Sequence, residues 1–512
     1  MKAINKYIIG IIGALLILTG CSKFLDRPTE NQQDAQLLDY TQLGNMYQPV
    51  SGLYRLAGGN NPGLIHWVDL GIRAVRGDDF TKGSTPQDQA GLSDIKNFSL
   101  GAVQSFFGLE NSWNDYFGLI MKCNQALTEL DKFGANIPSG DATNQKLYNQ
   151  YKGEVRFIRA FTLLVASRVF GNVPIITDNS TVGSVPRSSI ADARNFIMSE
   201  MDYCIANLED AVPNKSIHVG AVTKYSALLL KAKAAADLAG NDNGNANWDI
   251  VISTTDQIIN SGKCTLFPDF YNLFKIPGKL CDESLFELQY SDFGTGSGTS
   301  VSPDQFFAFQ GPGGDQKGSP ISGWGFIPPT NIIADFLKSR NDSVRIKTTL
   351  LNCGNPALVN TSGFLNSSST TPSGDVVYGN TNNQIYFNGK AYLPVNQMTS
   401  GRTSYGSNNN VRVLRYADAL LLNAEAKVRK GQNGDATFNL VRVRAKLSPI
   451  TGVTLTQVLD ERRAEFACEW WGERYNDLMR TGQAATALPG FTQNNAYLPV
   501  PQSQIDLNPN LK

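Results

Sequence analysis

Apolar residues recur at intervals of three or four along much of the first half of the chain, a spacing that places them on one face of a helix. Five amphipathic helices are predicted, at residues 113–133, 144–170, 190–212, 221–238 and 248–259. Short polar breaks separate them, so consecutive helices should pair as antiparallel hairpins. Alanines recur at positions where two helices would touch, which favours close packing.

The helix expected at residues 144–170 carries a clear apolar face that includes Phe157, Phe161 and Leu164. Gly171 should end this helix, because glycine readily adopts the left-handed conformation found after a helix. Stacked helix pairs of this sort resemble tetratricopeptide repeats, although the full repeat consensus is absent. Three arginines on this helix are expected to bridge to neighbouring helices through carboxylates: Arg156, Arg159 and Arg168.

Between residues 265 and 410 the helical pattern gives way to a composition rich in Gly, Ser, Thr, Asn and Pro. An extended run is expected at residues 284–290, and a helical pattern returns briefly at residues 331–338. The region is therefore predicted to be loop-rich and non-repeating. Functional residues often lie on such loops when a rigid scaffold carries them.

The helical pattern resumes at Val411 and continues toward the C-terminus. We expect one helix from Val411 to Gly431, a second that Asp435 caps, and a third that Thr454 caps and that continues through residues 461–482. Three glutamates there are spaced by four, so arginines should neutralise them in an ion-pair network. The glutamates are Glu461, Glu465 and Glu469, and the expected partners are Arg462, Arg463, Arg474 or Arg480.

Charge and histidine content exclude several classes of function. Lys and Arg number 45 and Asp and Glu number 45, so no net field draws the chain toward nucleic acid, and we expect no nucleic-acid partner. With only His66 and His218 present, a histidine-based zinc site or a Ser-His-Asp triad is not expected. We expect no cofactor, and a structural calcium ion is left open without assigned ligands.

The N-terminus has the pattern of a bacterial lipoprotein signal. Two lysines precede an apolar run at residues 7–18, and Thr19-Gly20-Cys21 follows it. The run is too short to span a bilayer, and small residues before a cysteine suit cleavage by the lipoprotein peptidase. Residues 1–20 are therefore predicted to be removed, which leaves Cys21 to carry acyl chains that hold the protein on a membrane surface.

The other six cysteines include no C-x-x-C pair, which argues against metal ribbons and thioredoxin-like motifs. A disulfide between Cys264 and Cys281 is one interpretation in an oxidising compartment. We favour the other interpretation, in which cysteines on apolar faces, such as Cys123, Cys204 and Cys468, are simply buried.

Four sequence blocks, together with the C-terminal segment, resemble the SusD/RagB family of outer-membrane lipoproteins from Bacteroidetes. The blocks are Cys21 followed by Phe24-Leu25-Asp26 and Pro28, RAFTLLVASRVFGNVPIIT from Arg159, RYADALLLNAEA from Arg415, and ERRAEF with ERYNDLMRTG; the C-terminal segment is YLPVPQSQIDLNPNL from Tyr497. Each block alone is weakly specific, but they follow one another in the order found in the family and span nearly the whole chain.

The resemblance implies a mainly α fold, in which a right-handed stack of tetratricopeptide-like helix pairs supports a large irregular, loop-rich region. Residues 21–264 would then form the helical scaffold, residues 265–410 the ligand-binding region, and residues 411–512 the C-terminal helices and closing segment. It also implies a function. The lipid-anchored protein would face the cell exterior, bind a glycan without catalysis, and deliver it to a TonB-dependent SusC-like outer-membrane barrel.

Sugar rings pack their C–H faces on aromatic side chains, while their hydroxyls pair with polar groups. Trp324 is the leading candidate for ligand contact, because glycines flank it and it lies where the family carries binding aromatics. Trp67 is the next candidate, although a loop tryptophan is buried for packing at least as often as it binds ligand. The remaining candidates are Tyr290, Asp292, Phe293 and Asp79.

Other aromatic residues are expected to serve packing. Trp113, Trp470 and Trp471 lie in helical patterns and should be buried in the core. The cluster of Phe306, Phe307 and Phe309 is expected to form a small core of its own.

Two alternatives to glycan binding stay open. Some relatives pair with peptide-importing barrels, so the ligand could be a peptide. A surface glycoside hydrolase could use two carboxylates, such as Asp78 or Asp79 with Asp292 or Asp304. Adjacent aspartates in a loop are more often caps, turns or calcium ligands, and the family resemblance implies binding without catalysis. We therefore expect no enzymatic activity.

Overall fold

The computed structural model describes residues 38–59, 62–290, 306–311, 323–352, 368–378, 384–398 and 408–512 of the chain. Within these ranges helices dominate, and the strands form three two-stranded antiparallel sheets. The mainly α fold expected from the sequence is confirmed.

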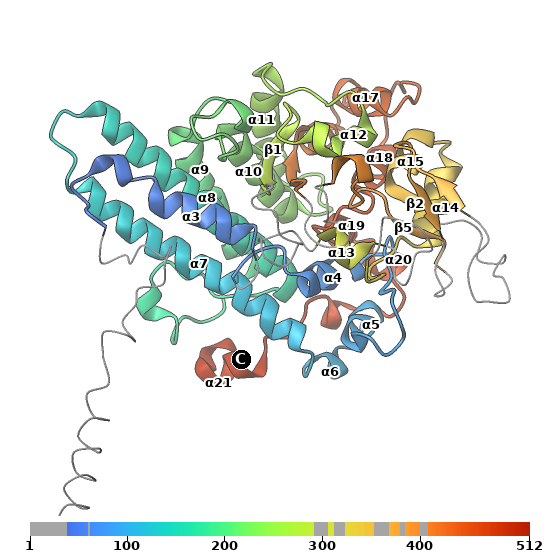
Figure 1. The fold of residues 1–512 in the computed structure, drawn as a ribbon, viewed down its shortest axis with the longest axis horizontal. Coiled ribbons are helices and arrows are strands. Elements are labelled where there is room, and N and C mark those ends of the chain that lie inside the picture. The colour runs from blue at the N-terminus through green and yellow to red at the C-terminus, as the bar shows by residue number, and fades with distance from the viewer. Residues whose placement is uncertain are drawn as a thin grey trace, which may run out of the picture.

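Five long helices form the scaffold. They are α7 (Phe107–Gly134), α8 (Ala142–Phe170), α9 (Ile190–Asn207), α10 (Lys224–Ala239) and α11 (Asn247–Asn260). Each packs against the next in sequence order, and α11 packs in turn against α16 (Tyr416–Arg429). Figure 1 shows α7, α8 and α9 on the left and α10 and α11 nearer the centre. The predicted helix pairs are therefore confirmed, although α7 begins at Phe107 rather than at residue 113.

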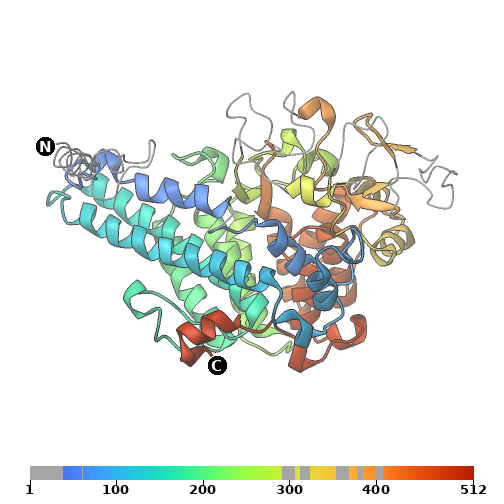
Figure 2. The ribbon, with the colours of Figure 1, turned by 60° about the horizontal axis from the view of Figure 1, so that its bottom comes forward.

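Shorter elements complete the fold. Before the scaffold lie α3 (Gln48–Ala57), α4 (Trp67–Val75), α5 (Ala90–Lys96) and α6 (Leu100–Val103). After it lie α12 (Phe270–Leu273), β1 (Ser284–Leu288), α13 (Phe306–Gln310), α14 (Asn331–Ser339), α15 (Ser343–Thr349), β2 (Leu350–Asn352), β3 (Ser368–Thr370), β4 (Val376–Tyr378) and β5 (Tyr386–Asn388). The C-terminal part contains β6 (Val411–Arg415), α17 (Asp435–Arg444), α18 (Leu455–Phe466), α19 (Glu473–Arg480), α20 (Ala484–Ala487) and α21 (Gln502–Leu507). In Figure 2 the C-terminal segment with α21 runs along the lower edge, beneath α7.

Helix α8 is largely buried within the scaffold, and its ends follow from the sequence. Asp141 caps the first turn by accepting a hydrogen bond from the Asn144 amide. At the other end, Gly171 has a φ of 74°, and a Cβ there would lie 2.8 Å from Cγ of Tyr497. Glycine is therefore needed both for the left-handed backbone and for the close approach of the C-terminal segment.

The three arginines of α8 bridge to neighbouring helices, as predicted. Arg156 and Arg159 each form an ion pair with Glu200 on α9, with N–O distances of 2.7 and 2.6 Å. Arg168 binds Asp237 on α10 at 2.9 Å. Because the carboxylates are almost fully enclosed, loss of a single partner would leave an uncompensated buried charge.

The helix predicted from Val411 is wrong over its first five residues. Residues 411–415 form strand β6, which pairs antiparallel with β1, so that Leu288 lies opposite Val411 and Ser284 opposite Arg415. The backbone groups of β1 are buried and need hydrogen-bonding partners, and this requirement outweighs the local helical pattern. The extended run expected from residue 284 is thus confirmed, and the helix begins only at Tyr416.

The single helix expected through residues 461–482 is two helices, α18 and α19. Cys468 and Gly472 both have positive φ, at 59° and 71°, so the chain turns between Phe466 and Glu473. Thr454 caps α18, as predicted. Asp435 does not cap α17: it is the first helical residue, and its carboxylate instead accepts hydrogen bonds from the amides of Gly452 and Val453.

The three glutamates of this segment lie in a buried ion-pair network, as predicted, but the predicted partners are wrong. Glu461 binds Arg340, Arg345 and Arg442; Glu465 binds Arg345, Arg415 and Arg444; Glu469 binds Arg415 and Lys390. Adjacent helix residues point about 100° apart, so Arg462 and Arg463 face other carboxylates. Arg462 binds Asp418, Glu473 and Asp477, while Arg463 binds Asp78 and Asp79.

A single cluster of buried apolar residues runs from Met46 to Leu511 and includes residues of β1, α14 and β6. The tryptophans assigned to the core are buried, at 3% exposure for Trp113, 2% for Trp470 and 8% for Trp471. The five cysteines in the described ranges are free thiols, which favours simple burial over a bridge between Cys264 and Cys281. None of the helices in these ranges is both long enough and apolar enough to span a membrane.

Candidate functional site

Trp67 and Trp324, which lie far apart in the sequence, meet at the surface of the fold. Their ring centroids are 6.1 Å apart, and their planes are nearly perpendicular, at 89°. Trp67 is the first residue of α4, and both tryptophans are partly buried rather than enclosed. The two leading sequence candidates therefore lie side by side in one aromatic cluster.

Backbone hydrogen bonds on two sides hold the segment that carries Trp324. The amides of Trp324 and Phe326 donate to the carbonyl oxygens of Ala308 and Phe309, at 2.7 and 3.0 Å. On the other side, the Ser84 amide donates to the Gly325 carbonyl at 2.8 Å. The position of the tryptophan is thus set by main-chain contacts with two other segments.

The glycines that flank Trp324 serve these backbone contacts. Gly325 has a φ of 75°, and a Cβ on Gly323 would lie only 2.6 Å from Cα of Gly311. We expected the glycines to keep the indole accessible; in the structure they let the chain pass close to residues 308–311. The outcome for the ring is the same, because it remains partly exposed.

Phe309 forms the floor beneath the two tryptophans. It is fully buried, its ring lies 5.4 Å from Trp67 and 6.4 Å from Trp324, and it stacks on Phe326 at 4.8 Å. The predicted packing role is confirmed for Phe309, but it belongs to the main apolar cluster rather than to a small core of its own. Figure 1 shows α13, which carries Phe309, next to α4.

Phe107 extends the exposed part of this cluster and was missed in the sequence. It is 46% exposed, and its ring centroid lies 6.1 Å from that of Trp67. The available signal was the Phe106-Phe107 pair, which precedes the periodic part of α7. We refer to Trp67, Trp324 and Phe107 together as the aromatic surface.

Tyr290 serves packing and main-chain contacts in this structure. It is 8% exposed, its hydroxyl donates to the Gly58 carbonyl at 2.6 Å, and its amide donates to Oδ1 of Asn410 at 3.0 Å. These contacts tie the end of β1 to the N-terminal segment and to the residues before β6. The two neighbouring candidates, Asp292 and Phe293, lie outside the described residues.

Asp79, a sequence candidate for ligand contact, is buried in an ion-pair group in this structure. It is 3% exposed and accepts from Arg463 at 2.9 Å, while Asp78 binds both Arg463 and Arg474. Burial raises the pKa of Asp79 above its ordinary value despite Arg463. Burial acts in the same direction on Asp78, but Arg474 and Arg463 outweigh it and lower the pKa of that carboxyl.

These ion pairs also bear on the glycoside hydrolase alternative. The carboxylates of Asp78 and Asp79 are directed at arginines that connect α4 and the following loop to α18 and α19. Neither is exposed to a sugar in this structure. Asp292 and Asp304, the suggested second carboxylates, lie outside the described residues.

A separate groove with a volume of about 440 Å³ lies beside β2 and β5. Three tyrosines and two lysines line it, namely Tyr271, Tyr386, Tyr392, Lys338 and Lys347. Its size falls within the range of small-molecule sites, and tyrosines with lysines offer both apolar faces and hydrogen-bond donors. The part of the chain that the structure describes contains no group of three or more His, Cys, Asp or Glu side chains placed to hold a metal ion.

Comparisons with known proteins identify the class to which this fold belongs. A profile of the SusD family matches residues 282–495. A SusD-like protein from Bacteroides ovatus is 24% identical over 483 residues, covering 91% of this chain and 81% of that protein. These matches confirm the resemblance to the SusD/RagB family, which the family profile shows over residues 282–495.

Solved structures agree with this assignment at the level of the fold. Surface glycan-binding protein A from Bacteroides fluxus superposes with a TM-score of 0.72 at 23% identity, covering 91% of this chain and 96% of that one. Surface glycan-binding protein A from Bacteroides thetaiotaomicron in complex with laminarihexaose gives a TM-score of 0.71 at 23% identity, covering 90% and 97%. At this identity the likeness establishes the SusD-like fold.

Proposed function

We propose that this protein binds a glycan without catalysis, through the aromatic surface of Trp67, Trp324 and Phe107. The observation that carries the proposal is the perpendicular pair of partly exposed tryptophans, with an exposed phenylalanine beside Trp67. Apolar C–H faces of a sugar ring pack well on such rings. Proteins of the same fold, including one solved with laminarihexaose, are surface glycan-binding proteins.

The proposal extends to location and partner. The signal pattern ending at Cys21 supports a lipid anchor on the outer membrane, with the folded part facing the cell exterior. Resemblance to the SusD/RagB family supports delivery of the bound glycan to a TonB-dependent SusC-like barrel. The protein would then act as a capture step that precedes transport.

Titration calorimetry tests the ligand class. The protein without residues 1–21 is titrated with laminarihexaose, with other oligosaccharides and with a mixed peptide pool. Trp324→Ala and Trp67→Ala should each weaken glycan binding by tenfold or more, because an anchoring aromatic contributes on the order of 2 kcal/mol. Binding of peptides but not glycans would contradict the proposal, as would unchanged glycan affinity in both variants.

Tyr148→Ala provides a matched control. This partly exposed tyrosine packs against Gly134, at the opposite end of α7 from Phe107. At 1.5 Å per residue, the two ends of this 28-residue helix are about 40 Å apart. Its substitution should leave glycan affinity unchanged.

New reducing ends after incubation with oligosaccharide would show a hydrolase and refute the non-catalytic part of the proposal.

A further inference from the structure

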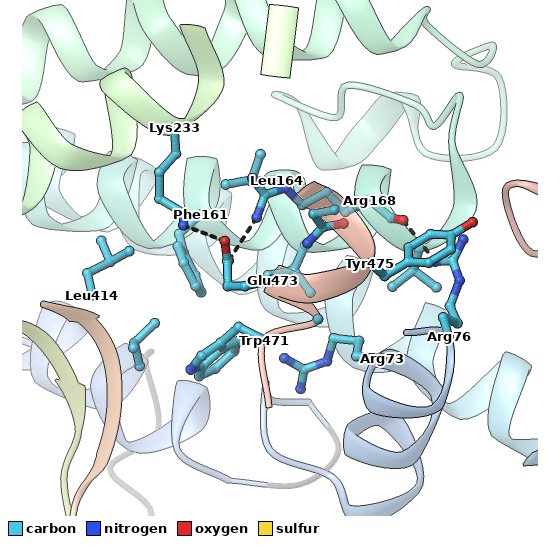
Figure 3. A pocket seen from close by; sticks show the side chains of 15 residues that line it. Arg73, Arg76, Phe161, Leu164, Arg168, Lys233, Leu414, Trp471, Glu473 and Tyr475 are labelled. Carbon is cyan, nitrogen blue, oxygen red and sulfur yellow. Dashed lines mark hydrogen bonds and ion pairs between the residues drawn. The ribbon is translucent and has the colours of Figure 1, made fainter. Parts of the chain in front are cut away.

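A small cavity lies where α4, α8, β6 and α19 meet, apart from the aromatic surface. Its volume is about 20 Å³, enough for one water molecule or an ion of similar size. Apolar walls come from α8, through Phe161 and Leu164, and from Trp471, which precedes α19. Figure 3 shows these side chains around the cavity, together with several cationic ones.

Arg73 supplies unpartnered hydrogen-bond donors at this cavity. Its side chain is 4% exposed, and Nη2 donates to Asp69 at 2.7 Å and to the Leu64 carbonyl at 2.8 Å. Nε and Nη1 are buried, and none of the residues that the structure describes accepts a hydrogen bond from them. The guanidinium lies over the Trp471 ring, 4.6 Å from its centroid, so the indole cannot accept these in-plane donors. A buried donor without an acceptor is costly, so this arrangement calls for a bound acceptor.

The charges around the cavity show what kind of acceptor fits. Four cations line it, namely Arg73, Arg76, Arg168 and Lys233, against one carboxylate, Glu473. Glu473 is already engaged by Arg168 at 3.2 Å and Lys233 at 2.9 Å. Figure 3 shows the carboxylate directed at these two groups, while Arg73 lies on the other side of the turn that carries it.

Arg76 is the least compensated of these cations. It is 3% exposed, and its guanidinium donates to the carbonyl oxygens of Arg168 and Ala496 and lies 4.0 Å from the Tyr475 ring centroid. None of the ion pairs found among the described residues gives it a carboxylate partner. Arg168 and Lys233, in contrast, each bind a second carboxylate, Asp237 and Asp418.

We infer that the cavity binds a monovalent anion of halide size, for which chloride is the abundant candidate. A single water could accept from Arg73 but would bring no negative charge to Arg76, for which no ion pair is found among the described residues. A chloride accepts from both unpartnered donors and lowers the electrostatic cost of burying Arg73 and Arg76. Larger anions such as gluconate do not fit a space of about 20 Å³.

The ion would also help to position the aromatic surface, because helix α4 connects the two sites. Helix α4 begins at Trp67 and carries Arg73 less than two turns later, with Asp69 joining Arg73 to the Tyr116 hydroxyl. Fixing Arg73 against β6 and α19 therefore also fixes the orientation of α4. Glycan affinity should be higher with chloride than without it, and this part alone rests on the proposed glycan function.

Two measurements on the whole mature protein test the anion site independently of any glycan. Crystals soaked in sodium bromide are measured at the bromine absorption edge, and we expect an anomalous peak within hydrogen-bond distance of Nε or Nη1 of Arg73. In solution, Tm should be about 1 to 2 °C higher in sodium chloride than in sodium gluconate of equal ionic strength, at about ten times the dissociation constant. A cavity without an anomalous peak, or equal Tm in the two salts, would overturn the inference.

Arg73→Lys distinguishes the effect of the bound anion from that of the salt bridge between Arg73 and Asp69. The lysine keeps a positive charge within reach of Asp69 but removes the two unpartnered donors. We expect this variant to lose the chloride-dependent rise in Tm, whereas Arg55→Lys, on the exposed face of α3, should retain it. An undiminished chloride effect in Arg73→Lys would overturn the assignment of the site to this cavity.

Discussion

Glu154 on α8 is a fully buried carboxyl that should make stability depend on pH in an unusual direction. The hydroxyls of Tyr47 and Tyr54 donate to Oε2 at 3.1 and 2.9 Å, while Oε1 is buried and has no hydrogen-bond partner among the described residues. Burial raises the pKa of Glu154 from 4.5 to about 8, although the two tyrosine hydrogen bonds act in the opposite direction. The carboxyl is therefore largely protonated in the folded protein at neutral pH.

The sign and size of the effect follow from these values. Between pH 4.5 and 8 the folded state holds a proton that the unfolded state has released, so the free energy of unfolding falls as pH rises. At 1.36 kcal/mol per pKa unit, the full loss by pH 8 is roughly 5 kcal/mol, and about 3 kcal/mol is lost by pH 7. No screening correction is needed, because the side chain is 0% exposed.

Glu154→Gln removes this titration and keeps an oxygen for the two tyrosines. Near pH 5 we expect the free energy of unfolding of the variant to equal that of the wild type or to lie slightly below it. The amide group that replaces the unpartnered oxygen is buried without an acceptor, at a cost of about 1 to 3 kcal/mol. Near pH 8 it should be the more stable protein, by roughly 2 kcal/mol or more. The order of stability should therefore reverse between pH 5 and pH 8.

Urea unfolding of the two proteins at pH 5, 6, 7 and 8 measures this reversal, since groups common to both cancel in the difference. Glu110→Gln, at an exposed position on α7, is the matched control and should follow the wild type at every pH. Parallel pH profiles for the wild type and Glu154→Gln would refute the assignment of a raised pKa to this buried carboxyl.

Three further changes test other parts of the structure. Glu425→Gln should lower the free energy of unfolding by about 3 to 5 kcal/mol at pH 7, because Arg480 and Arg429 lose their buried partner. Burial alone would raise the pKa of Glu425, but these arginines hold it at about 2, so the wild type loses this stability as pH falls from 4.5 through 2. Urea midpoints measured at decreasing pH should show a smaller loss in the variant. Tyr386→Ala should weaken glycan binding only if the ligand also occupies the groove beside β5, and calorimetry alongside Trp324→Ala shows whether it does. Cys21→Ser should shift the protein from the membrane fraction to the soluble fraction, and recovery with membranes would contradict the lipid anchor.

The helical scaffold could be predicted because local signals agree with the tertiary packing there. Asp141 and Gly171 determine where α8 begins and ends, and both act on neighbouring backbone groups. The β6 strand could not be predicted, because its partner β1 lies far away in the sequence. The turn between α18 and α19 was missed for a related reason, since Cys468 carries no sequence sign of its positive φ.

The candidate site was predicted in part. Trp67 and Trp324 were recognised separately as aromatic residues in loops, and only the fold shows that they touch. Asp79 had the composition of a ligand contact, but its arginine partner comes from α18, which no local pattern reveals. Phe107 was missed because it lies at the start of a helix in which most of the other apolar residues are core.

The pairing of β1 with β6 has a consequence for how the chain tolerates change. It holds residue 288 opposite residue 411, so the two ends of the segment between them are fixed together by one ladder. The entropy of closing a loop grows only with the logarithm of its length, so lengthening a connection within an already long segment adds little. Exposed turns within residues 289–410 should therefore accept insertions at little cost in free energy. Arg345 and Lys390 should not accept replacement, because they neutralise buried glutamates of the C-terminal part. New ligand contacts could thus be added on exposed turns without loss of stability, as long as these ion pairs are kept.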